Sequence, residues 1–138
     1  MRPQSCKSKG RRLQQRISES ILLTFPHLSA DDVTSTPMGA PGEDVRMSKL
    51  ARESLPISIE CKCVEKINIW QSLLQCETNA PAETTPCLIF SRNRSATYAV
   101  IKWETLLDLF KRLESGDGEQ LPPRLQTLIH EIATFLPD

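Results

Sequence analysis

The segment at residues 56–64, "PISIECKCV", constrains the fold more than any other part of the chain, because its side chains alternate in character. One set is apolar or small and comprises Ile57, Ile59, Cys61 and Cys63. The other set is polar and comprises Ser58, Glu60 and Lys62. A period of two predicts a β-strand with two different faces. Charged groups are costly to bury without partners, so the polar face predicts either contact with solvent or a functional site.

Helical and strand-like patterns surround this segment. Apolar residues at helical spacing predict a first helix at 9–25, which ends at Pro26 because the residue before a proline avoids helical geometry. Short apolar or β-branched runs predict further strands at 33–36, 43–47, 87–92 and 97–103. Helices are also predicted at 67–77, 104–113 and 124–135. This order predicts an α/β or α+β domain, in which helices flank a central mixed sheet and an extra helix follows at the C-terminal end.

The chain has 138 residues, which is long enough for one compact domain with a single core. We predict a flexible basic arm at 1–8, the main domain at 9–115, and a linker with a C-terminal helix at 116–138 that packs on the same domain. Trp70 and Trp103 lie on a predicted helix and a predicted strand, and both are expected to be core anchors.

The composition excludes several classes of protein. Hydrophobic residues make up 39% of the chain and charged residues 25%, as in soluble globular proteins. No apolar run approaches the roughly 20 residues that cross a bilayer, and no secretory signal is visible, so we expect a cytoplasmic protein without a membrane partner. The odd number of five cysteines argues against a disulfide framework. Cys61 and Cys63 are expected to be small core residues, because their spacing suits a zinc site less well. No glycine-rich phosphate loop is present, so no nucleotide cofactor is expected.

Positive charge is concentrated near the N-terminal end, although the formal net charge is zero. Residues 1–30 hold six basic side chains and one acidic side chain. Such a region predicts either contact with a polyanion or a solvated surface, and the sequence leaves both open. The candidates for contact with DNA phosphates are Arg11, Arg12, Arg16, Lys49, Arg52 and Lys66. Lys49 and Arg52 are expected in a loop; Arg92 and Arg94, in a predicted hairpin turn, carry the same two interpretations.

A candidate site emerges if the strand at 43–47 pairs antiparallel with the strand at 57–63. Asp44, Glu60 and Lys62 then project from one sheet face within reach of one another. Two carboxylates so placed repel each other unless a cation lies between them, and a hard divalent cation accepts carboxylate oxygens and phosphate. The backbone carbonyl of Cys61 could supply another oxygen. An ammonium such as that of Lys62 can stabilise the developing charge when a phosphate is attacked by water.

These residues carry a resemblance to a known family. The stretches "GED", "IECK" and "INIWQSLLQ" resemble the PD-(D/E)XK nuclease superfamily. Over residues 9–103 the chain is similar to small phage-encoded endonucleases and archaeal-type Holliday-junction resolvases. The resemblance implies a restriction-endonuclease-like core. It also implies metal ligands at Asp44, Glu60 and the Cys61 carbonyl, a catalytic Lys62, and supporting glutamines at Gln75 and Gln71. In resolvases a first-helix glutamate is a further ligand; here Gln14 and Gln15 occupy that neighbourhood and the nearest acid is Glu19.

The resemblance implies a Mg²⁺-dependent endodeoxyribonuclease, in which Mn²⁺ can substitute. It implies DNA as the partner, branched DNA included, and a homodimer in a bacterial or phage-infected host cell. Two other classes of function stay open. The altered first-helix position favours a catalytically inactive nucleic-acid-binding module on the same fold. Alternatively Glu60 and Lys62 form an ordinary surface ion pair, worth at most about 1 kcal/mol, in an interaction protein without nucleic-acid affinity.

Overall fold

The computed structural model describes residues 3–115, 127, 128 and 130–132, with the side chains from residue 6 onward. The chain divides into two compact units, Met1–Ile101 and Lys102–Asp138, which are described separately below. This division lies at residue 101, whereas the sequence places the end of the main domain at 115. The predicted linker and most of the predicted helix at 124–135 lie outside the described residues.

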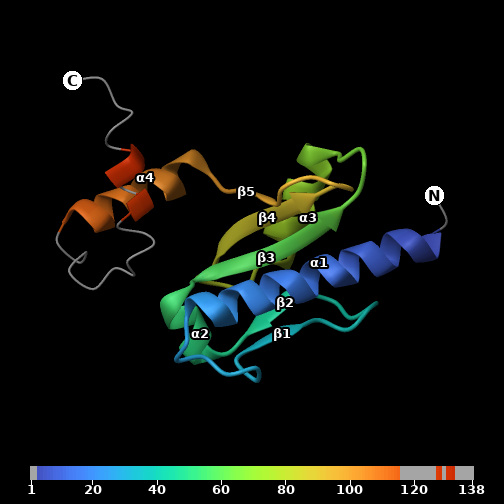
Figure 1. The fold of residues 1–138 in the computed structure, drawn as a ribbon, viewed down its shortest axis with the longest axis horizontal. Helices are drawn as coiled ribbons and strands as arrows, with labels where there is room; N and C mark the ends of the chain where they lie inside the picture. Colours follow the sequence, from blue (N-terminus) through green and yellow to red (C-terminus); the bar gives the residue numbers. More distant parts are fainter. Residues whose placement is uncertain (1–2, 116–126, 129, 133–138) are drawn as a thin grey trace. The chain divides into compact units, whose positions relative to one another are not determined.

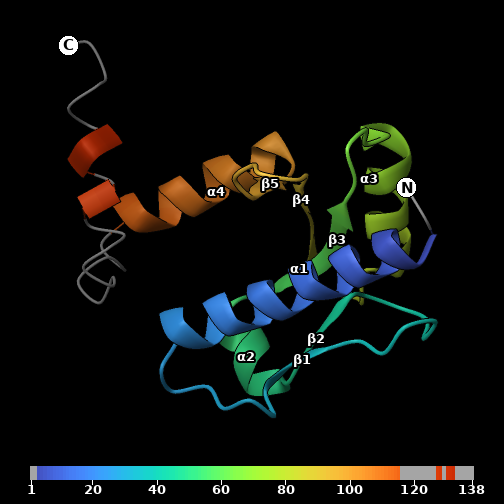
Figure 2. The same ribbon diagram turned by 45° about the vertical axis from the view of Figure 1, so that its right-hand side comes forward.

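The first unit is built on a five-stranded mixed sheet (Figure 1). The strands lie in the order of the sequence, and only β3 and β4 are parallel. Helix α1 packs on β1 and β3, and helix α3 packs on β3 and β4 from the other side (Figure 2). The bounds are α1 Pro3–Thr24, β1 Val33–Ser35, β2 Val45–Met47, α2 Lys49–Ser54, β3 Ile57–Cys63, α3 Ile69–Asn79, β4 Thr85–Ser91 and β5 Tyr98–Val100. The predicted mixed sheet flanked by helices is therefore confirmed.

Strand β3 is central, and both of its faces are covered. Its apolar face lies in the main core with α1, where Leu13 and Ile59 are almost fully buried. Its polar face lies under α3, where the Cys76 Sγ is 3.9 Å from the Ser58 carbonyl oxygen. The predicted antiparallel pairing of β2 with β3 is confirmed, with Val45 opposite Ile59. The two faces thus separate an apolar core from a polar layer.

Two local predictions differ from the structure. The first helix, predicted from residue 9, begins at Pro3, so residues 3–8 are helical. A short helix, α2, occupies the expected loop that holds Lys49 and Arg52. Ser48 caps α2, because its Oγ accepts the Ala51 amide at 3.1 Å. A serine before a run of good helix formers was the available signal for this helix.

Two large apolar side chains of α3, Trp70 and Leu74, face outward. Trp70 is 82% exposed and Leu74 is 64% exposed, whereas Ser72 and Cys76 are buried. The prediction that Trp70 is a core anchor is therefore wrong. Because α3 covers the polar face of β3, its inner side carries small and polar side chains instead of large apolar ones.

The second unit contains α4, Trp103–Glu114. Helical geometry also occurs at residues 127, 128 and 130–132. Trp103 opens α4 and is 65% exposed, so its prediction as a strand residue in the core is wrong. Within the described part of the chain, no helix has the length and apolar character needed to cross a membrane.

Candidate active site

Asp44 is held in place at the end of β2 by three hydrogen bonds. Its amide donates to the Ile59 carbonyl at 2.9 Å, and its carbonyl accepts from the Thr36 amide at 2.9 Å. Its carboxylate Oδ2 accepts from the Cys61 amide at 2.7 Å. The Asp44 carboxylate thus takes the place of a backbone carbonyl as the acceptor for the Cys61 amide, and it adds one hydrogen bond between this segment and β3. A turn with Gly42 at a φ of 97° leads the chain into this position.

Glu60 and Lys62 lie on the same face of β3, as the alternation predicts. The Lys62 Nζ is 3.6 Å from the Glu60 Oε1. Glu60 is only 2% exposed, and its Oε2 has no hydrogen-bond partner among the described residues. A buried carboxylate oxygen without a partner is costly, and either a proton or a cation lowers that cost.

Helix α3 positions the lysine. The Lys62 Nζ donates to the Gln75 Oε1 at 2.8 Å. Asn79 lies one turn further along α3, and its side chain lowers the pKa of Glu60. Gln71 instead accepts from the Asn68 Nδ2 at 3.4 Å, at the start of the helix. Asn79 is not among the residues predicted from the sequence, although its spacing of four residues from Gln75 places both on one helix face.

Burial dominates the electrostatics of the two carboxyl groups. Burial raises the pKa of Asp44, whereas the hydrogen bond from the Cys61 amide and the charge of Lys62 lower it. Burial also raises the pKa of Glu60, and the charge of Asp44 raises it further, whereas Lys62 and Asn79 lower it. The two carboxylates therefore act on each other through their charges.

The pair of carboxylates suits a hard cation better than a structural metal. Among the described residues, no three His, Cys, Asp or Glu side chains gather into a group that could hold a metal ion. Asp44 and Glu60 supply two carboxylates, and the Cys61 carbonyl points to the strand side where the Cys61 amide meets Asp44. Mg²⁺ is commonly held by one or two carboxylates and keeps several waters, so this donor set fits it. The partnerless Glu60 Oε2 is the oxygen that such an ion would satisfy.

The first-helix residues lie elsewhere. Gln14 is buried and its Oε1 accepts from the Ser35 Oγ at 2.7 Å, and Gln15 is exposed. Glu19 is exposed and lines a hollow with basic residues of α1. The structure therefore does not bring Glu19 together with Asp44 and Glu60.

The predicted DNA-binding residues fall into different environments. Arg12 and Arg16 are exposed on α1, as is Arg11, which lines a separate hollow with Met38. Lys49 is exposed on α2, and Lys66 is exposed between β3 and α3.

Arg52, on α2, is bound within the protein. Its guanidinium forms an ion pair with the buried Glu43 and donates to the Ile57 carbonyl at 3.2 Å. Glu43 directly precedes Asp44, so this ion pair braces the chain that enters the candidate site. The second carboxylate oxygen of Glu43 is also buried without a partner among the described residues.

Comparison of the chain with protein-family models, with curated proteins and with solved structures finds no match.

Proposed function

We propose that the protein is a metal-dependent DNA endonuclease of the PD-(D/E)XK type, acting in the cytoplasm of a bacterium or phage-infected host. The observation that carries this proposal is the meeting of Asp44, Glu60 and Lys62 at one end of the β2–β3 ladder. Burial raises the pKa of Glu60 and of the half-buried Asp44, and a cation between the two carboxylates would favour their charged forms. A Mg²⁺ ion, with Mn²⁺ as a substitute, is a cation of this kind.

Each residue has a distinct role in the proposed hydrolysis of the phosphodiester bond. Asp44, Glu60 and the Cys61 carbonyl would hold the ion, which when bound would activate water and polarise the scissile phosphate. Lys62 would place its ammonium against the charge that develops on the phosphate during attack. Gln75 holds that ammonium in position through its 2.8 Å hydrogen bond. The substrates would include branched DNA, and a homodimer would allow cuts in two strands.

One observation favours a second function, a nucleic-acid-binding module without catalysis. Glu19 does not join the two carboxylates, and Gln14 is engaged with Ser35. The site therefore has one acidic ligand fewer than the resemblance to resolvases implies. Such a module would bind DNA and leave it intact in the presence of either metal.

Cleavage assays distinguish the two functions. Labelled four-way junction, linear duplex and single-stranded DNA are incubated with the native protein, in Mg²⁺ and in chelator, beside Lys62→Ala and Arg46→Gln. Arg46 is an exposed arginine of β2 outside the site, so its variant controls for the loss of one positive charge. We expect Mg²⁺-dependent cutting that Lys62→Ala slows at least about 100-fold and Arg46→Gln leaves unchanged. Full activity of Lys62→Ala would refute the catalytic assignment, and binding without cutting in Mg²⁺ and Mn²⁺ would establish the inactive module.

A further inference from the structure

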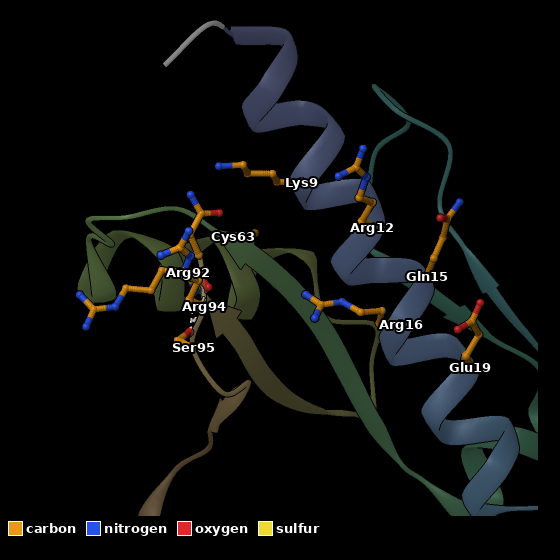
Figure 3. Close-up of a pocket in the computed structure, with 10 residues that line it drawn as sticks. Lys9, Arg12, Gln15, Arg16, Glu19, Cys63, Arg92, Arg94 and Ser95 are labelled. Atoms are coloured by element: carbon orange, nitrogen blue, oxygen red, sulfur yellow. Dashed lines mark hydrogen bonds between the residues drawn. The ribbon is translucent and has the colours of Figure 1, made fainter.

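A basic groove lies between α1 and the turn that connects β4 with β5 (Figure 3). Its cavity volume is about 580 Å³. Among the described residues, five basic side chains line the groove, Lys9, Arg12, Arg16, Arg92 and Arg94, together with one acidic side chain, Glu19. The groove therefore concentrates positive charge in a chain whose formal net charge is zero.

The three cations of α1 form one stripe along the helix. Lys9, Arg12 and Arg16 are spaced by three and four residues, which places them on the same helix face. Seven residues of α-helix rise by about 10 Å, the length over which one strand of duplex DNA presents about three phosphates. Figure 3 shows Lys9 and Arg16 extending toward the turn, while Gln15 and Glu19 point to the other side of the helix.

The turn at residues 92–95 holds the opposite wall in a defined conformation. The Ser95 Oγ accepts from the Arg92 amide at 3.0 Å, and the Asn93 amide donates to the Glu65 carboxylate at 3.2 Å. Arg94 adopts a φ of 58°, a left-handed conformation that glycine and asparagine tolerate better than arginine. A long cationic side chain is thus present where the backbone alone would favour a small residue.

The arginines of the groove are exposed and carry no internal ion pair. Arg12, Arg16, Arg92 and Arg94 are all exposed, and none of them has a carboxylate within 4.0 Å among the residues that the structure describes. Arginines without internal partners, arranged on two walls of one groove, fit a ligand with a row of negative charges.

We propose that this groove binds the phosphodiester backbone of a nucleic acid. Arginine contacts to phosphates position a nucleic acid without reading its sequence, which suits a groove that is lined mainly by cations. The groove is distinct from the candidate active site, because it is lined by Cys63 and lies on the α1 side, whereas Lys62 faces α3. Binding in the groove therefore requires neither a metal ion nor hydrolysis.

The test measures binding alone. Fluorescence anisotropy follows the association of the full chain with a labelled 30-base-pair DNA duplex in chelator, over a series of KCl concentrations. The double variant Arg92→Gln/Arg94→Asn removes two charges of the turn, and asparagine at 94 preserves the left-handed conformation. The matched control is Arg46→Gln/Arg112→Gln, which removes the same charge from exposed positions outside the groove. Thermal unfolding verifies that each variant is folded.

We expect the groove variant to raise Kd at least about tenfold. We also expect it to reduce the slope of log Kd against log salt by about 2, because each lost phosphate contact removes about 0.9 from the slope. Arg92→Lys/Arg94→Lys should retain the native salt slope. The proposal fails if the groove variant and the control have the same Kd and slope, or if the native chain does not bind the duplex. Binding that is lost in the groove variant, with no cleavage by the native chain, would uphold the groove and refute the nuclease.

Discussion

The candidate active site and the basic groove hold their charges in opposite ways. In the site, Glu60 is buried and Asp44 is fixed by three hydrogen bonds. In the groove, Arg16 and Arg92 are exposed and their guanidiniums have no carboxylate partner among the described residues. Desolvated charges need partners that fix their geometry, whereas exposed charges keep the freedom to follow a flexible polyanion. The first arrangement suits chemistry at one phosphate, and the second suits contact with several.

This comparison predicts that two arginine-to-alanine substitutions change the stability of the protein by very different amounts. Arg52→Ala should lower the free energy of unfolding by about 3 kcal/mol, because it leaves the buried Glu43 carboxylate without its partner. Arg16→Ala should change it by less than about 0.5 kcal/mol, because Arg16 is exposed. Urea unfolding of both variants measures the difference. A stable Arg52→Ala protein that binds DNA weakly would instead make Arg52 a DNA contact.

The next prediction concerns the orientation of Lys62. Gln75→Ala removes the acceptor of the 2.8 Å hydrogen bond and leaves the ammonium free to turn away. If the site hydrolyses DNA, kcat should fall about tenfold, or about 1.4 kcal/mol, with little change in KM. Thr78→Ala, also on α3, is the control, because the Thr78 hydroxyl donates to the Leu74 carbonyl of its own helix. A rise in KM at constant kcat would show that Gln75 contributes to binding rather than to the position of Lys62.

The smallest predicted effect is a gain in the stability of the fold when Glu60 is replaced by glutamine. Burial and Asp44 raise the pKa of Glu60 above its ordinary value of 4.5, so the folded chain holds this proton more tightly than the unfolded chain. The stability that Glu60 contributes is therefore present at low pH and is lost as the pH rises above 4.5. Without divalent cations, Glu60→Gln should be more stable than the native chain by about 1 kcal/mol at pH 7.

The direction of this pH dependence is tested by measuring the free energy of unfolding of the native chain and of Glu60→Gln between pH 4 and pH 8. The advantage of Glu60→Gln should shrink as the pH falls toward 4, where the native Glu60 is protonated as well. An advantage that grows on acidification would mean that the carboxylate is stabilised in the fold, and it would remove the physical reason for a cation at this site.

The sequence predicted the parts of the site that depend on local pattern. The alternation of residues 57–63 identified β3, and the supposed antiparallel pairing with the strand at 43–47 is the one that the structure has, with the Asp44 carboxylate at the Cys61 amide. The prediction that Trp70 is a core anchor is wrong, because this side of α3 faces outward. The inner side of α3 packs on polar residues of β3. The sequence of α3 alone does not show which face of the sheet the helix covers.

Other features depend on contacts that no local pattern reveals. The ion pair of Glu43 with Arg52 joins the loop before β2 to α2, a helix that the sequence analysis did not anticipate. The basic groove joins Arg16 to Arg92, which are far apart in the sequence. Such features follow from the order of the strands, and they become visible only when the sheet is assembled.

The buried thiols around β3 have a practical consequence. Burial raises the pKa of Cys61, and it raises the pKa of Cys76 and of Cys87 to about 11. The thiolate is the form that reacts with alkylating reagents, so these three cysteines stay inert at neutral pH while the fold is closed. They become reactive when α3 lifts from the sheet or the strands separate. The rate of their alkylation therefore reports how often this part of the molecule opens, without an added label.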